Sequence, residues 1–220
     1  MNIIAITNIY LFVCACAGLV YGLSVMFKKK QPLYFKLAIF PLACHAFSRV
    51  FYIVTLLCYG GLPATFNIGF FGFAAFFLFL YLQNVGTIDN LLDDEDKKFT
   101  KYKLLALIAP ACEMVIAVWA FNCSSASISV RLSFVVLAAL AGLAGYFNIK
   151  HALEPDVEGG IIRALRRFNI LCFALEILTL AEVGLYCFGL TNPIIIQILL
   201  GILYIMYLPL LNKEMKKWIQ

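Results

Sequence analysis

The sequence predicts an all-α, polytopic membrane protein, a bundle of seven transmembrane helices that forms one transmembrane domain over residues 1–220. Three observations support this prediction. Hydrophobic residues make up 64% of the chain and charged residues 13%, whereas soluble domains average about 45–50% and about 25%. The apolar residues gather in seven runs, each long enough to cross a bilayer. The basic residues fall on alternate connections between these runs.

The predicted helices follow the apolar runs in order. These runs cover residues 3–27, 33–59, 65–87, 104–122, 129–148, 164–189 and 193–211. They are continuous rather than alternating, which indicates helices, because strands with an open edge in lipid would leave backbone groups unpaired. The first run lacks a basic amino-terminal region and is followed by Lys28, Lys29 and Lys30. It is therefore predicted to be a permanent helix and not a cleaved signal peptide.

Lysine and arginine predict the orientation of the bundle. Apart from Arg49 and Arg131, all of them lie at or near the first, third and fifth connections or in the carboxyl-terminal tail. Because cytoplasmic loops carry the excess of basic residues, we expect an outside amino terminus and a cytoplasmic carboxyl terminus, in a plasma (inner) membrane. Orientation also accounts for the lysines, so no nucleic-acid partner is expected. The run from Asp93 to Lys98 is predicted to be a solvated connector, and a regulatory or metal-binding loop is the alternative.

Five ionisable side chains interrupt the apolar runs: Arg49, Glu113, Arg131, Glu176 and Glu182. A charge in the bilayer centre costs about 2.5–3.5 kcal/mol on insertion scales, so these groups should face the bundle interior and pair. Their depth along the helices predicts that Arg49 pairs with Glu113 or Glu176. The same reasoning predicts that Arg131 pairs with Glu182. One carboxyl is left without a basic partner and is predicted to be protonated or linked to solvent.

Polar neighbours extend these charges into a predicted ligand-binding site between the second, fourth and sixth helices. The side chains at 45, 49 and 52 share one helical face, and those at 179 and 182 share another. A guanidinium and an imidazole there could hold an anionic or zwitterionic solute, while carboxylates take a cation or a proton. Internal ion pairs that only set helix register are the alternative. The predicted site comprises His45, Arg49, Tyr52, Asn67, Glu113, Glu176, Thr179, Glu182 and Gln197.

Short matches predict that the first three helices recur as the last three. Residues 15–19 resemble residues 139–143, and residues 58–60 resemble 187–189. The repeats would cover 3–87 and 129–211, with 104–122 as a linker helix; chance similarity among apolar segments is the alternative. This three-plus-one-plus-three arrangement resembles, in architecture alone, that of the sugar-transporting SWEET proteins and the KDEL receptors. Parallel repeats of this type place substrate between the halves. The prolines that SWEET proteins carry in the first helix of each half are missing here.

These features together predict a small-solute transporter or carrier, with the lipid bilayer and a small polar or anionic solute as partners. A seven-helix receptor or sensor that signals to a cytoplasmic protein partner is the alternative, and a subunit of a larger membrane complex is the third class. An enzyme is disfavoured, because no aspartate lies in any predicted helix and no acidic residue follows His45 and Ser48 on their face. The cysteine and histidine spacings predict neither a metal nor a cofactor.

Overall fold

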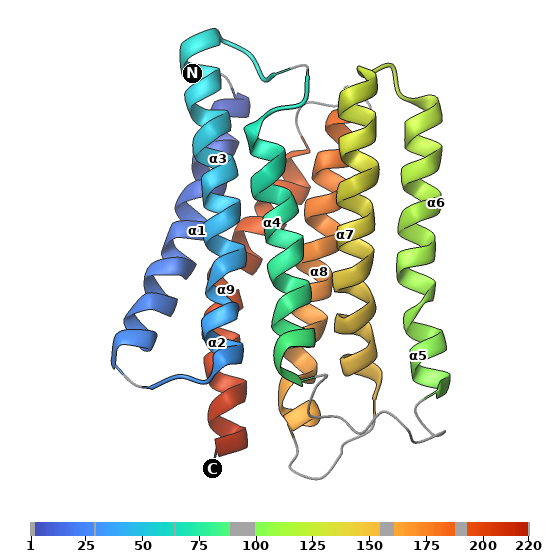
Figure 1. Cartoon of the computed structure of the whole chain (residues 1–220). Coiled ribbons are helices and arrows are strands. Elements are labelled where there is room, and N and C mark those ends of the chain that lie inside the picture. Colours follow the sequence, from blue (N-terminus) through green and yellow to red (C-terminus); the bar gives the residue numbers. More distant parts are fainter. Residues whose placement is uncertain are drawn as a thin grey trace.

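The computed structural model describes residues 3–28, 30–63, 65–88, 100–154, 161–187 and 193–219, without the side chains of 88, 161–163, 186, 187 and 217–219. Within these ranges the regular structure is helical, and seven segments are long and apolar enough to cross a membrane (Figure 1). The predicted all-α seven-helix bundle is confirmed, and the chain is a multi-pass membrane protein. The connector from Asp93 to Lys98 and part of the second repeat match, residues 188 and 189, lie outside the described residues.

Each apolar run corresponds to one span. The first three spans are α1 (Ile3–Lys28), α2 with α3 (Leu33–Leu37 and Ile39–Tyr59), and α4 (Ile68–Gln83), which continues as the π-helical segment η1 (Asn84–Ile88). The remaining spans are α5 with α6 (Thr100–Ala106 and Ile108–Cys123), α7 (Ile128–Leu153), α8 (Ile161–Cys187) and α9 (Ile194–Ile219). Helices α7 and α9 both end later than their apolar runs. In α9 the exposed side chains of Lys213 and Lys216 can extend toward water while the backbone stays helical.

Two spans are interrupted shortly before a proline. Ala38 separates α2 from α3 and precedes Pro41, and Leu107 separates α5 from α6 and precedes Pro110. Proline has no backbone N–H, and its ring clashes with the carbonyl of the preceding turn. Pro41, Pro110 and Pro209 inside apolar runs predict a distortion in three spans; the prediction is confirmed for the first two and wrong for the third. Helix α9, by contrast, continues through Pro209 without an interruption.

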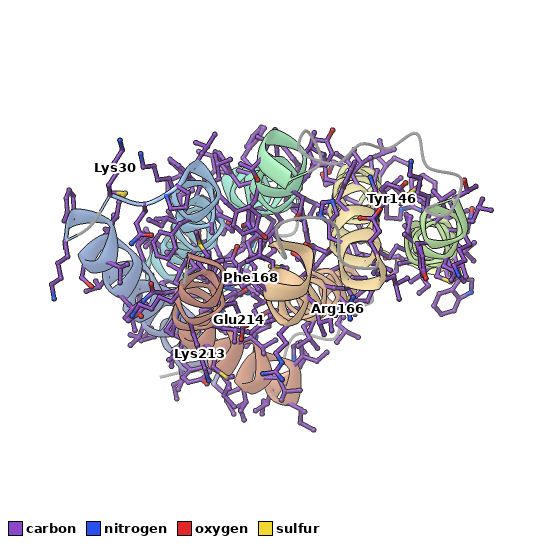
Figure 2. The ribbon with its side chains drawn as sticks, turned by 90° about the horizontal axis from the view of Figure 1, so that it is seen from below. Lys30, Tyr146, Arg166, Phe168, Lys213 and Glu214 are labelled. Atoms are coloured by element: carbon purple, nitrogen blue, oxygen red, sulfur yellow. The ribbon has the colours of Figure 1, made fainter. Side chains whose placement is uncertain are left out.

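Six of the described spans close into a ring. Helix α1 packs on α3 and α9, α3 packs on α4, α4 on α7, α7 on α8, and α8 on α9. Helices α5 and α6 lie outside this ring and pack mainly on α7, at the edge of the bundle (Figures 1 and 2). Exchanging the first three spans with the last three leaves the order of contacts in the ring unchanged. The ring therefore agrees with a repeat of three helices, which stays a prediction.

Aromatic side chains fill the ring, and glycines let its helices approach one another. Phe35, Phe76 and Phe168 are fully buried, and Figure 2 shows Phe168 near the middle of the bundle. A Cβ atom at Gly18 of α1 would lie 2.5 Å from the carbonyl oxygen of Tyr204 on α9. Such contacts between small residues and backbone give helices in lipid the close packing that holds them together.

Candidate functional site

A buried ion pair lies in the half of the ring nearest the amino terminus. Arg49 of α3 donates to both carboxylate oxygens of Glu182 on α8, one bond having a length of 3.0 Å. The same guanidinium donates to Asn8 Oδ1 of α1 at 3.1 Å and, through Nε, to His45 Nε2 at 2.9 Å. Gln197 of α9 donates to Glu182 Oε1 at 2.9 Å. We call these five residues, all 0% exposed, the Arg49 cluster.

The hydrogen bonds of the cluster determine the state of the imidazole. Because the guanidinium can only donate, His45 Nε2 must accept, so the ring is neutral with its proton on Nδ1. His45 Nδ1 lies 3.0 Å from the hydroxyl of Tyr204 on α9, which lies 3.4 Å from Thr179 Oγ1. Phe73 packs over the guanidinium, with its ring centroid 5.3 Å from Arg49 Cζ. The network thus joins four helices of the ring around one bidentate ion pair.

The predicted partners of Arg49 were wrong. Arg49 pairs with Glu182, and not with Glu113 or Glu176. The two glutamates of α8 are six positions apart in the sequence, which places them about 120° apart around a helix of 3.6 residues per turn. Glu182 therefore faces α3 while Glu176 faces α7. Glu113 cannot serve as a partner either, because its helix α6 lies outside the ring.

The prediction that Arg131 pairs with Glu182 was also wrong. Arg131 donates from Nη1 to the carbonyl oxygen of Phe121 at 2.9 Å and lies over the Phe121 ring. It joins the start of α7 to the end of α6. The carbonyl groups at a helix end have no partner within the helix, so a guanidinium satisfies one of them without a carboxylate.

The two remaining glutamates form a second polar centre. Glu113 of α6 and Glu176 of α8 lie close enough for their carboxyls to interact directly. Glycines of α7 leave room for them: a Cβ at Gly145 would lie 2.5 Å from Glu176 Oε1, and one at Gly142 would lie 3.6 Å from Glu113 Oε2. Asn148 of α7 donates to Glu176 Oε2 at 3.4 Å. We call Glu113 and Glu176 the carboxyl pair.

Two predicted site residues lie apart from both centres. Tyr52 packs where α3 crosses α4, against Gly69 and with its ring centroid 6.0 Å from that of Phe73. Asn67 is half-buried and caps α4, since its Oδ1 accepts a hydrogen bond of 3.0 Å from the backbone N–H of Gly69. The amide at 67 thus has a local role, because the first N–H groups of a helix need acceptors.

Replacing Asn67 by alanine is expected to lower the free energy of unfolding by about 1 kcal/mol, the usual value of an N-cap. The variant Asn67→Asp should keep the cap, because a carboxylate accepts the same hydrogen bond. Both changes are measured by unfolding in mixed detergent micelles. Equal losses in the two variants would contradict the capping role.

Several residues of the two centres carry no charge and were not predicted. Asn8, Tyr204 and Asn148 complete the hydrogen bonds described above, and Asn84 donates to Asn148 Oδ1 at 2.8 Å. All four are 0% exposed. A search for amides inside apolar runs would have found the asparagines, whereas the tyrosine is indistinguishable from other tyrosines in the sequence.

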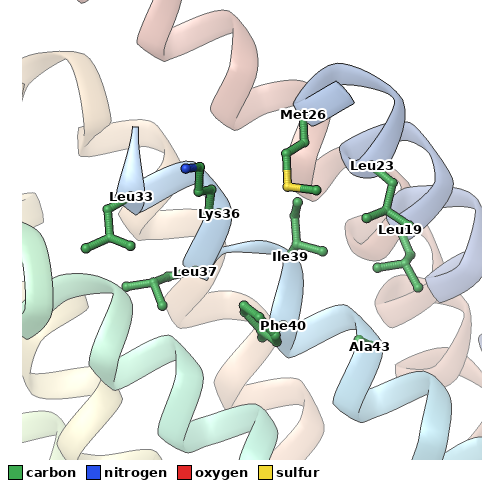
Figure 3. A pocket seen from close by; sticks show the side chains of 9 residues that line it. All are labelled: Leu19, Leu23, Met26, Leu33, Lys36, Leu37, Ile39, Phe40 and Ala43. Atoms are coloured by element: carbon green, nitrogen blue, oxygen red, sulfur yellow. The ribbon is translucent and has the colours of Figure 1, made fainter. Parts of the chain in front are cut away.

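An apolar groove of about 560 Å³ lies elsewhere, between α1 and the break that separates α2 from α3 (Figure 3). Its walls come from Leu19, Leu23 and Met26 on one side and from Leu37, Ile39 and Phe40 on the other, among others. Among the described residues that line it, Lys36 is the one with an ionisable side chain. The groove does not reach the Arg49 cluster, which is closed in this structure.

Fold and site together define a class: a polytopic α-helical membrane protein whose seven spans enclose a hydrogen-bonded ion pair and a separate carboxyl pair. No protein-family model, curated protein or solved structure matches the chain.

Proposed function

We propose that the chain is a transporter or carrier of a small anionic or zwitterionic solute, and that the Arg49 cluster is its solute site in a closed state. The observation that carries this proposal is the fully buried bidentate pair of Arg49 with Glu182. A planar guanidinium matches carboxylate and phosphate groups in the same two-bond geometry. An anionic group of a solute could therefore take the place of the Glu182 carboxylate.

The energetics of buried charge support a functional role for the pair. The free energy needed to remove two ions from water often exceeds the free energy gained from their attraction. Apolar residues of similar size therefore often stabilise a core as well as a buried ion pair does, or better. The cluster also holds polar groups from α1, α3, α8 and α9, that is, from both predicted repeats. In transporters built from parallel repeats, the solute site lies between the halves.

Irregular helices supply places where the bundle could move. The span that carries Arg49 is interrupted at Ala38, and the span of α4 ends in the π-helical segment η1. Interrupted and π-helical turns are frequent at functional sites, because the backbone there has fewer regular hydrogen bonds to break. Opening of the closed cluster by a movement of α3 against α8 and α9 would admit a solute.

We also propose that the end of the bundle with the carboxyl terminus faces the cytoplasm, in a plasma or inner membrane. Lys30, Arg166 and Lys213 lie at this end, as Figure 2 shows. Cytoplasmic loops carry the excess of basic residues in membrane proteins. The Arg49 cluster, nearer the opposite end, would then lie toward the outside.

Solute binding tests the proposal. Purified protein in detergent is heated with acetate, glutamate, citrate or phosphate, and an anion that binds the folded state should raise Tm. The variant Arg49→Lys keeps the charge and loses the two-bond geometry, so we expect affinity to fall at least about tenfold, the loss of one charge-assisted hydrogen bond. Arg131→Lys is the matched control, because Arg131 lies outside the cluster, and it should bind as the native protein does.

Uptake into proteoliposomes then separates the classes of function. Uptake of the stabilising anion that is lost in Arg49→Lys and kept in Arg131→Lys supports transport. Binding without uptake supports the receptor instead. A Tm that none of the anions changes, or affinity that is equal in the two variants, contradicts Arg49 as the solute site.

A further inference from the structure

The carboxyl pair is buried within the bundle and is not a surface cluster. Glu176 is 0% exposed and Glu113 is 4% exposed. A Cβ at Gly145 would lie 2.5 Å from Glu176 Oε1, so the glycine leaves room for the carboxyl in its present position. Apart from the interaction between the two carboxyls, no described residue forms a hydrogen bond to either oxygen of Glu113, and Glu176 Oε1 has only the backbone of Gly145 beside it. Both oxygens of Glu113 therefore lack a donor outside the pair.

The charges around the pair do not neutralise it. Within the described chain, neither carboxyl forms an ion pair, since Arg49 is bound to Glu182 and the Lys150 ammonium lies 4.0 Å from Glu154 Oε1. The groups that face the pair are Asn148 of α7 and, on α8 itself, the thiol of Cys172. Two carboxylates at close range in a medium of low dielectric constant cannot both be ionised. A proton between them removes the repulsion and supplies the missing donor.

The remaining titratable neighbours lie one step away. On α9, Tyr207 interacts with Cys172 and donates to Gln83 Oε1 at 2.8 Å. On α7, beyond Asn148, lies the imidazole of His151. None of these neighbouring groups supplies a cation to the carboxyls. The described residues also contain no set of three His, Cys, Asp or Glu side chains that could hold a metal ion, so the donor set suits a proton.

A row of buried polar side chains leads from the pair to the end of the bundle with the carboxyl terminus. Glu176 Oε2 accepts from Asn148, Asn148 Oδ1 accepts from Asn84 at 2.8 Å, and Asn84 Oδ1 lies 3.1 Å from His151 Nδ1. The last of these residues stands in the final turns of α7. The packing of these hydrophobic helices does not require such a row, because each buried polar group costs free energy unless it is hydrogen-bonded.

We propose that Glu113 and Glu176 form a proton-binding site that is loaded from the end of the bundle with the carboxyl terminus, along Asn148, Asn84 and His151. The proton comes from the medium at that end, and it ends bound to a carboxylate oxygen of the pair; no other bond changes. The amides supply the donors and acceptors that a water-mediated transfer requires. The imidazole, which is itself 0% exposed, is the titratable group at the end of the row nearest the carboxyl terminus. That this proton drives solute movement rests on the proposed function, whereas proton binding itself does not.

Carbodiimide labelling tests proton binding in the native protein. Dicyclohexylcarbodiimide reacts with protonated carboxyls in apolar surroundings, and the labelled glutamates are identified by peptide mass. At pH 7 we expect labelling of Glu113 or Glu176 to exceed that of Glu182 at least about tenfold, the ratio that about 1.4 kcal/mol of protonation free energy produces. Glu182 is the internal control, because it is equally buried and paired with Arg49. Labelling of all three glutamates to the same extent would overturn the proposal.

The route is tested in proteoliposomes with different pH on the two sides. Labelling of the pair should fall as pH is raised on the side that faces the carboxyl terminus, and the rate of this response should fall at least about tenfold in Asn148→Leu. Asn122→Leu, at an exposed amide of α6, should respond as the native protein does. A response to the pH of the opposite side would overturn the route. Labelling without solute uptake would support the proton-binding site and contradict the proposed transport. Solute uptake without labelling would support transport and contradict the proton-binding site.

Discussion

Replacing Glu182 by glutamine is expected to lower the free energy of unfolding by about 3–5 kcal/mol, because the change leaves the Arg49 guanidinium buried without an anion. Both groups are 0% exposed, so water cannot replace the lost carboxylate. The free energy is measured by reversible unfolding in mixed detergent micelles. The matched control is Glu113→Gln, which removes a buried carboxyl without a cationic partner and should cost about 1 kcal/mol or less.

A double-mutant cycle separates the pair from its surroundings. The variant Arg49→Met with Glu182→Met should lose less stability than the sum of the two single changes, since apolar groups can replace a buried ion pair at little cost. Additive losses would show that the two side chains do not depend on one another. Equal losses in Glu182→Gln and Glu113→Gln would contradict the assignment of Glu182 as the partner of Arg49.

The change Gly18→Ala is expected to lower the free energy of unfolding by about 1–3 kcal/mol, through overpacking between α1 and α9. The new methyl group would lie 2.5 Å from the carbonyl oxygen of Tyr204, and a backbone atom cannot move aside as a side chain can. Without that contact, alanine would stabilise a helix by about 1 kcal/mol relative to glycine. A decrease in the free energy of unfolding therefore indicates that α1 and α9 are in close contact at Gly18.

Two other glycines provide the comparison for Gly18. A Cβ at Gly22 would meet the side chain of Leu208, which can adopt another rotamer, so Gly22→Ala should cost less. A Cβ at Gly61 would have nothing within 4 Å, and Gly61→Ala should leave stability within about 0.5 kcal/mol of the native value. If Gly18→Ala stabilises the protein, α1 and α9 do not pack as described.

Much of the fold was predictable because hydropathy is a local property. The seven apolar runs predicted all seven spans, and Pro41 and Pro110 predicted where two of them are distorted. The helix ends were less predictable, since α9 extends to Ile219 through residues that hydropathy assigns to the tail. Charged residues that follow an apolar run can belong either to the last turns of the helix or to an irregular tail.

The grouping of the candidate site residues was predicted in part, whereas their role in binding stays a prediction. Arg49, His45, Thr179, Glu182 and Gln197 do meet, and Glu113 meets Glu176. The depth of each residue was readable from its place along a helix, but the direction in which it points within the ring was not. Asn8 and Tyr204 were missed because their apolar runs contain no acidic or basic residue that would mark a polar face, although they hold Arg49 and His45 in place.

The amino-acid sequence alone determined the number of spans and the presence of ionisable groups inside them, because the cost of placing a residue in lipid depends mainly on that residue and its near neighbours. Only the tertiary structure decided that Arg49 meets Glu182 while Glu113 meets Glu176. That choice depends on the rotation of α8 and on the position of α6 outside the ring. Contacts between helices far apart in the sequence set both, and no local pattern encodes them.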